Sequence, residues 1–200
     1  MILRRDFLML AASAALLPLA HVARAQGMDK ASSFVKATGD RLVGVVNGGG
    51  SADTKRATMT KILNDAVDVD GIARFCLGRF WRTATPAQQT EYVQLFHQVL
   101  VNNITAKLGE YQGVSFTMGR ARMDGENGVV STTVTRPNNP PTAVDWIVSD
   151  PASSPKVIDV VAEGTSLRLT QRQDYASYLT HNGNSVDALI TAMKKQLAQG

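Results

Sequence analysis

The sequence predicts an α+β fold in which an antiparallel sheet of four or slightly more strands packs against several helices. Apolar residues recur at helical spacing before residue 111 and after residue 170, whereas segments of alternating polarity fill residues 114–162. Short polar connections without helices join these segments, which favours antiparallel pairing. Strands that follow helices as a group, instead of alternating with them, are typical of an α+β domain.

The amino terminus has the layout of a secretory signal. Arg4 and Arg5 precede an apolar run over residues 7–20, and small residues near Ala25 predict cleavage after that position. A run of about 14 residues is shorter than the roughly 20 that a membrane-spanning helix needs. The arginine pair also fits a twin-arginine signal, so the general secretory and twin-arginine routes both stay open. We expect a cleaved signal peptide (1–25) and one periplasmic domain (26–200).

Charge and cysteine content exclude several classes of protein. The formal net charge is +4, which falls to about +2 without the first 25 residues, and this is too small for a nucleic-acid partner. Cys76 is the only cysteine, so no intramolecular disulfide forms, and the thiol is either buried and inert or reactive. No spacing of His, Asp or Glu resembles a metal site, and no cofactor motif occurs.

Helices are expected first along the chain. Amphipathic spacing predicts helices over residues 28–46, 54–67 and 69–77, and the glycine-rich residues 47–51 form a linker between the first two. A longer helix is predicted over residues 86–111. Thr85 and Gln88 make a capping box and Pro86 suits the first turn, while the apolar stripe contains Tyr92, Leu95, Phe96, Val99, Leu100, Ile104, Leu108 and Tyr111.

Strands and two final helices complete the expected order. Alternating polarity predicts strands over residues 114–123, 129–136, 143–149 and 156–162, with turn residues between them. Helical spacing returns over residues 170–181 and 185–199.

Two segments resemble a known family. Residues 80–96, which begin Phe-Trp-Arg-Thr-Ala-Thr-Pro-Ala-Gln-Gln, and residues 157–167, Val-Ile-Asp-Val-Val-Ala-Glu-Gly-Thr-Ser-Leu, look like the MlaC family, also called the toluene-tolerance auxiliary proteins. The resemblance covers most of the chain after residue 25. Family members are periplasmic proteins that shuttle phospholipid between an outer-membrane lipoprotein complex and an inner-membrane ABC transporter complex, and so maintain outer-membrane lipid asymmetry.

The resemblance implies a curved sheet closed by helices over an apolar cavity for acyl chains. A related branch accompanies hopanoid biosynthesis, so a hopanoid is an alternative cargo. The polar pair Asn102-Asn103 and the glycine-rich linker depart from the family pattern and leave room for it. The expected cavity lining consists of apolar residues of the strands and the long helix: Phe96, Leu100, Ile104, Leu108, Phe116, Val130, Val134, Val144, Trp146 and Val160.

Energetics set what such a carrier requires. Two acyl chains expose about 30 methylenes, whose hydration costs on the order of 20 kcal/mol at about 0.8 kcal/mol each. A carrier therefore needs a large dry cavity. The pattern alone favours apolar residues that pack on one another as an ordinary core, whereas the resemblance favours a lipid cavity.

Two carboxyl groups make a small cavity enzyme the alternative to a lipid carrier. Asp145 and Asp159 lie within apolar strand patterns, where burial can raise a carboxyl pKa toward that of a general base. In the simpler interpretation both residues face water or pair with arginine. Glu163 and Arg172 are candidates for a pair that fixes the turn at Gly164. We assign no catalytic residue and expect a noncatalytic lipid carrier.

Overall fold

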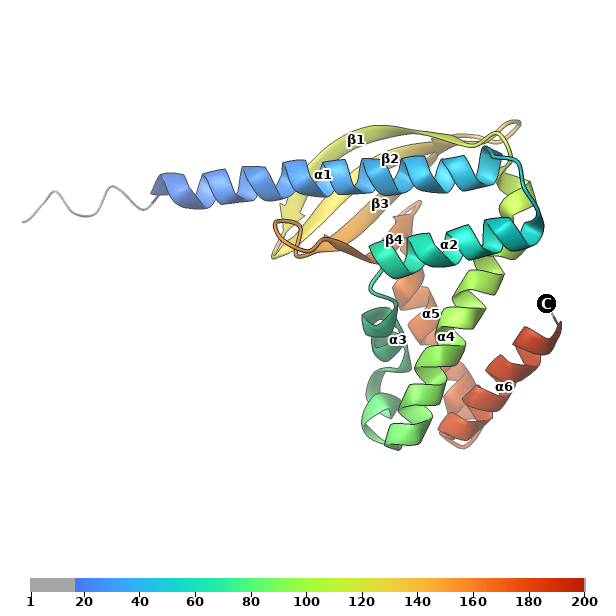
Figure 1. Ribbon diagram of the computed structural model, residues 1–200. Coiled ribbons are helices and arrows are strands. Elements are labelled where there is room, and N and C mark those ends of the chain that lie inside the picture. Colours follow the sequence, from blue (N-terminus) through green and yellow to red (C-terminus); the bar gives the residue numbers. More distant parts are fainter. Residues whose placement is uncertain (1–16, 200) are drawn as a thin grey trace, which may run out of the picture.

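The computed structural model describes residues 17–199, with side chains from residue 26 onward (Figure 1). The helices that precede the sheet are α1 (Leu17–Asn47), α2 (Ala52–Ala66), α3 (Val69–Leu77) and α4 (Pro86–Ala106), with the 3₁₀ helices η1 (Gly78–Arg82) and η2 (Leu108–Tyr111). The strands are β1 (Ser115–Asp124), β2 (Asn127–Thr135), β3 (Thr142–Ser149), β4 (Lys156–Ala162) and β5 (Thr165–Ser166), and α5 (Leu167–His181) and α6 (Val186–Gln199) follow. The predicted α+β class is confirmed.

The five strands form one antiparallel sheet in the order β1-β2-β3-β4-β5. Strand β5 was not predicted from the sequence, because two residues are too few to show alternation. The pairing register shifts between Met118 and Ala121 in β1 and between Ile147 and Val148 in β3. Such irregularities bend strands and increase twist, and the sheet is curved where it passes behind α1 in Figure 1.

Helix α1 crosses one face of the sheet (Figure 1). Ala31 and Val35, one helical turn apart, are buried against Val130 and Val148. Further along α1, a Cβ atom at Gly39 would lie 2.5 Å from Cζ of Phe116. Small residues on this side of α1 therefore let the helix approach the strands closely.

Helices α3, α4, α5 and α6, with η1, form a second apolar core, away from α1. Tyr92 of α4 is completely buried, and its hydroxyl group donates a hydrogen bond to the Ala73 carbonyl at 2.9 Å. Its ring meets those of Phe96 and Tyr175 at centroid distances of 6.0 and 6.2 Å. The tilted and edge-on arrangements are ones that aromatic pairs prefer.

The predicted capping box at the start of α4 is confirmed, but the predicted end of this helix at residue 111 is wrong. The Thr85 hydroxyl group accepts from the Gln88 amide, and the Gln88 side chain accepts from the Thr85 amide. The α-helix ends at Ala106, and the chain tightens into η2. The Asn47 side chain bonds the Gly113 amide and the Val114 carbonyl, and so ties the chain beyond η2 to the end of α1.

The predicted signal peptide lies largely outside the described residues. Only residues 17–25 are described, and they belong to the continuous helix α1. Within residues 17–199, no helix combines the length and the apolar character that crossing a membrane requires.

Candidate functional site

The sheet face that α1 covers carries all six strand residues of the predicted lining. Residues opposite one another in an antiparallel sheet point to the same face. Val130 pairs with Trp146, which pairs with Val160 on its other side. Two further pairings, Thr132 with Val144 and Phe116 with Val134, continue the same face because they fall at even spacing along the strands.

This face is only partly sealed. Val130 is fully buried and Val144 is nearly so, whereas four of the six strand residues keep part of their surface exposed: Phe116, Val134, Trp146 and Val160. The Trp146 indole contacts the α1 cluster, and its Nε1 donates to the Thr132 hydroxyl group at 3.0 Å. The one polar group of the indole is therefore satisfied within the protein.

The helix residues of the predicted lining lie elsewhere. Phe96 is buried in the helical core and Leu100 packs against that core. Ile104 is half-buried on α4, and Leu108 is half-buried in η2. The structure therefore divides the ten predicted residues into a strand group under α1 and a helix group, and their assignment to one lipid cavity stays a prediction.

A groove of about 710 Å³ lies among α2, α4, η2 and α6. Its apolar lining includes Val99, Leu108 and Leu197, and its polar lining includes the Asn102-Asn103 pair. Asn102 accepts a hydrogen bond from Arg56, and Asn103 accepts one from Gln196 at 3.2 Å. Sequence reasoning missed this groove, because its walls come from separate helices whose packing no local pattern records.

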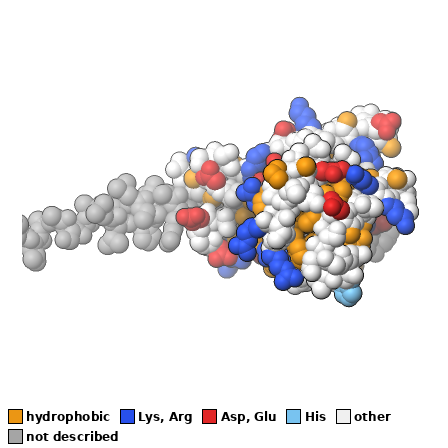
Figure 2. Space-filling view, turned by 90° about the horizontal axis from the view of Figure 1, so that it is seen from below, with side chains coloured by type: hydrophobic (Ala, Val, Ile, Leu, Met, Phe, Trp, Pro, Cys, Tyr) orange, Lys and Arg blue, Asp and Glu red, His pale blue; other side chains and the backbone are white. Residues whose placement is uncertain are grey.

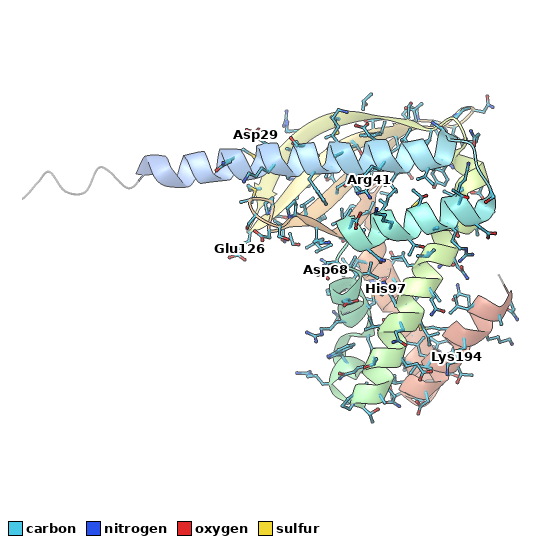
Figure 3. The ribbon with its side chains drawn as sticks, in the orientation of Figure 1. Asp29, Arg41, Asp68, His97, Glu126 and Lys194 are labelled. Atoms are coloured by element: carbon cyan, nitrogen blue, oxygen red, sulfur yellow. The ribbon has the colours of Figure 1, made fainter. Side chains whose placement is uncertain are left out.

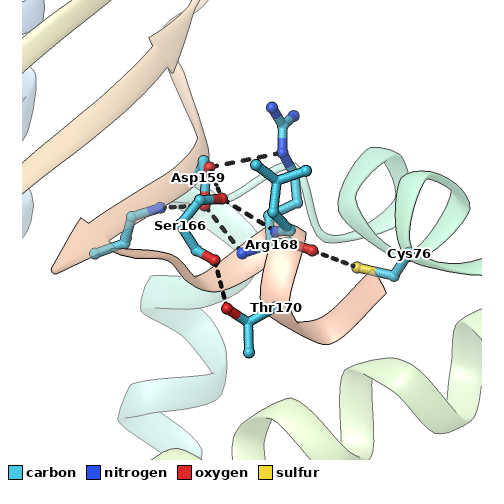
Figure 4. Close-up of polar contacts among 7 residues, drawn as sticks. Cys76, Asp159, Ser166, Arg168 and Thr170 are labelled. Atoms are coloured by element: carbon cyan, nitrogen blue, oxygen red, sulfur yellow. Dashed lines mark hydrogen bonds and ion pairs between the residues drawn. The ribbon is translucent and has the colours of Figure 1, made fainter. Parts of the chain in front are cut away.

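Asp159 organises the junction between β4 and α5 (Figure 4). The Asp159 carboxylate accepts hydrogen bonds from the Val160 amide at 2.8 Å, the Arg168 amide at 3.1 Å and the Ser166 hydroxyl group at 2.6 Å. Ser166 caps α5 by accepting from the Leu169 amide. Asp159 is only 6% exposed, so its oxygen atoms are occupied by neighbouring donors and closed to a substrate.

Asp145 lies on the same sheet face as Asp159, the face opposite to Trp146. Its carboxylate accepts from the Ser131 hydroxyl group at 2.6 Å and lies 3.6 Å from Nη1 of Arg122. Asp159 likewise lies 3.8 Å from Nε of Arg168. Both residues therefore pair with arginine, as the simpler interpretation expected, and neither points toward the apolar face as a general base would.

The predicted pair of Glu163 and Arg172 does not form, so it does not fix the turn at Gly164. Glu163 is exposed and has a φ of +51°, and Gly164 follows with a φ of +79°, a conformation that favours glycine. The Arg172 guanidinium lies 4.7 Å from the centre of the Phe75 ring. Asp159 supplies the carboxylate that holds the junction, a role set by the fold of the β4–α5 turn and not revealed by spacing along the chain.

Cys76 is a buried thiol beside this junction. Its Sγ lies 3.6 Å from the Arg168 carbonyl oxygen, and burial raises the pKa of the thiol to about 12. The thiol group is therefore protonated at neutral pH and unsuited to nucleophilic chemistry.

Charged residues elsewhere form pairs on the outer surface of the helices. Nη2 of Arg41 lies 2.9 Å from Oδ2 of Asp65, and Nε2 of His97 lies 2.7 Å from Oδ1 of Asp70. Figure 3 shows Arg41, His97 and Lys194 on three different helices. They lie too far apart to form one catalytic cluster.

Comparisons with known proteins agree with this fold. A family model described as MlaC protein matches residues 36–195. The toluene tolerance protein ttg2D of Pseudomonas putida is 27% identical over 143 residues, which cover 70% of this chain and 66%, just under two thirds, of that protein. A phospholipid-binding protein from Ralstonia solanacearum, solved in complex with a phospholipid, superposes with a TM-score of 0.74 at 24% identity, covering 84% of this chain and 97% of that one. Since the family model spans most of the sequence, this chain belongs to the MlaC family.

Proposed function

We propose that this protein is a noncatalytic periplasmic carrier that binds a phospholipid by its acyl chains. In this proposal residues 1–25 direct export and are removed, and residues 26–200 form the lipid-binding domain. The protein takes phospholipid from one membrane complex and delivers it to another. The partners are an outer-membrane lipoprotein complex and an inner-membrane ABC transporter complex, and the exchange maintains outer-membrane lipid asymmetry.

The observation that carries this proposal is the incomplete burial of apolar side chains on the sheet face toward α1. Phe116, Val134 and Trp146 point to the covered side of the sheet and yet keep accessible surface. Each Å² of apolar surface removed from water contributes about 25 cal/mol. Acyl chains laid along this face would bury these side chains as well as their own methylenes.

The distribution of charge supports the same role. The Asp145 and Asp159 carboxylates lie on the opposite sheet face and are held by hydrogen-bond donors. An acyl chain along the apolar face would therefore meet no carboxylate from β3 or β4. Lipid transfer between membranes needs no bond to be made or broken, so the carrier requires no catalytic group, and its partners set the direction of transfer.

A matched pair of variants tests the site. Val134 lies on the proposed lipid-contacting face, whereas Thr133, its neighbour in β2, is exposed on the other face. Protein purified gently from cells is extracted with organic solvent, and the lipid is identified and quantified by mass spectrometry. We expect about one phospholipid per chain in the wild type and in Thr133→Glu. We expect strong loss in Val134→Glu, because an unpaired charge in apolar surroundings costs several kcal/mol.

The outcome decides between the proposed cargoes. Wild-type protein that carries no lipid, and that takes none from labelled vesicles, contradicts the proposal. Recovery of a hopanoid instead of phospholipid selects the alternative cargo. Chemically altered lipid that disappears with Asp159→Asn would identify an enzyme.

A further inference from the structure

One surface of the helical part is formed by arginines of three different elements. Arg74 of α3, Arg79 and Arg82 of η1 and Arg172 of α5 line a single shallow cavity of about 340 Å³ together with Phe75, Gly78 and Trp81. We call this surface the arginine face. In Figure 2, Lys and Arg side chains gather along one side of the helical part, seen from below.

The arginines of this face are unpaired among the described residues. Within residues 26–199, whose side chains are described, none of its four arginines takes part in an ion pair. No Asp or Glu lines its cavity or the adjoining one formed by Arg79, Phe80, Arg82, Thr83 and Asn184. Arg74, Arg79 and Arg82 are exposed. Four positive charges therefore share one small area, and among the described residues no carboxylate lines it.

Aromatic rings hold three of these guanidinium groups in place. Arg74 lies 4.8 Å from the centre of the Trp81 ring, and Arg79 lies 4.9 Å from that of Phe80. Arg172 lies 4.7 Å from the centre of the Phe75 ring. Stacking orients a guanidinium plane and reduces the entropy that it loses when it binds a carboxylate.

Gly78 shows how closely the elements of the arginine face meet. It has a φ of +59°, and a Cβ atom there would lie 3.2 Å from a terminal nitrogen of Arg172. The turn between α3 and η1 therefore leaves room for the Arg172 side chain. The arginines of η1 and α5 lie together because α5 packs against α3, although they are far apart in the sequence.

We propose that the arginine face docks on a carboxylate-rich surface of a protein partner. The partner belongs to a membrane complex that gives or accepts the lipid, and this assignment rests on the proposed function. The chemistry favours a protein over a bilayer. The face contains arginine and no lysine, and arginine is the cation enriched in protein interfaces. Its aromatic residues are buried or half-buried beneath guanidinium groups, so none protrudes to enter a membrane.

The test uses a photo-crosslinking amino acid at Thr83, an exposed residue beside Arg82, in the full chain expressed in cells. The variant combines Arg74→Glu, Arg79→Glu and Arg82→Glu. Its matched control changes charge equally at exposed basic residues elsewhere, with Lys61→Glu, Lys107→Glu and Arg120→Glu. We expect crosslinks to a segment of a membrane-complex subunit rich in Asp and Glu. Their yield should fall about tenfold or more in the variant, because like charges repel, and stay unchanged in the control.

Two further measurements keep the result unambiguous. The purified variant and the purified wild type should take up equal amounts of lipid from labelled vesicles, since the arginine face is separate from the sheet and this uptake needs no partner. Wild-type protein without lipid would refute the proposed function and leave the docking result standing. If the triple variant fails to fold, a salt series on the wild type replaces it, and yield should fall between about 0.15 and 0.5 M salt as screening shortens the range of the charges.

Three results would overturn the inference. One is a crosslinking yield that neither charge reversal nor salt reduces. Another is a crosslinked segment without a cluster of acidic residues. The third is sedimentation of the wild type, and not of the Arg74→Glu, Arg79→Glu and Arg82→Glu variant, with vesicles of phosphatidylglycerol, which would identify an anionic bilayer as the target.

Discussion

Removal of the Asp159 carboxylate should destabilise the junction between β4 and α5. The carboxylate satisfies two backbone amides and the Ser166 hydroxyl group, and it faces the Arg168 guanidinium. Nε of Arg168 has no hydrogen-bond partner among the described residues, so its position depends on the nearby charge. Asp159→Ala removes all four interactions from a site closed to water.

The magnitude follows from the burial of the groups left behind. A buried donor without a partner costs about 1–3 kcal/mol, and loss of one partner from a buried ion pair costs about 3–5 kcal/mol. We expect Asp159→Ala to lower the free energy of unfolding by about 3–5 kcal/mol, because these costs overlap at one site. Asp159→Asn keeps the shape and one acceptor oxygen, so about 1–2 kcal/mol is expected.

Asp145→Ala is the matched control. Asp145 lies on the neighbouring strand, also bonds a serine and an arginine, and has a side chain that is 32% exposed. Solvent screening reduces its contribution to about 1 kcal/mol or less. The assay is urea unfolding, supported by thermal melting, in which each kcal/mol shifts Tm by about 2–4 °C for a chain of this size.

We expect Tm to fall by roughly 6–20 °C in Asp159→Ala and by only a few degrees in Asp145→Ala. Equal melting of Asp159→Ala and the wild type would refute the structural role of this carboxylate. Equal losses for the two alanine variants would show that burial does not set the difference. If Asp159→Ala keeps its stability but loses a chemical activity on lipid, Asp159 would instead be a general base.

Three further outcomes can be measured on the purified protein. Tyr92→Phe removes the buried hydrogen bond from the Tyr92 hydroxyl group to the Ala73 carbonyl and should lower the free energy of unfolding by about 1 kcal/mol in urea, and an unchanged midpoint would count against this bond. Cys76, whose pKa burial raises to about 12, should react with Ellman's reagent at pH 8 only after denaturation, whereas rapid labelling of native protein would contradict its burial. Thr85→Ala should cost about 1 kcal/mol through loss of the capping box, while Thr90→Ala on the exposed surface should cost less than half of that.

Much of the fold was predictable because its signals are local. The capping box at Thr85 and Gln88 depends on residues three positions apart, and helical or alternating spacing depends on the next few residues. Alternation also placed Val130, Trp146 and Val160 on one face, because strand geometry alone decides which residues share a side. Short polar turns then predicted the antiparallel order of the strands.

Other features depend on which surfaces meet in three dimensions. The apolar stripe predicted for this helix runs to Tyr111, but the α-helix ends at Ala106, and Asn47 of α1 bonds the chain beyond η2. The same apolar spacing placed Phe96 with the strand residues, whereas packing places it in a separate helical core. Periodicity identifies an apolar side of an element and does not identify its neighbour.

The polar contacts also depend on which parts of the chain meet in the folded protein. Spacing suggested Glu163 and Arg172 at the turn, but the folded chain uses Asp159 with Ser166 and Arg168. The arginine face likewise exists only because α5 returns to lie against α3 and η1. The sequence by itself determined most of the elements and the class of protein, since these rest on short-range hydrogen bonding, periodicity and family resemblance. Only the tertiary structure decided the partners of each charge and apolar side chain, because those contacts depend on how turns and elements pack, which periodicity does not specify.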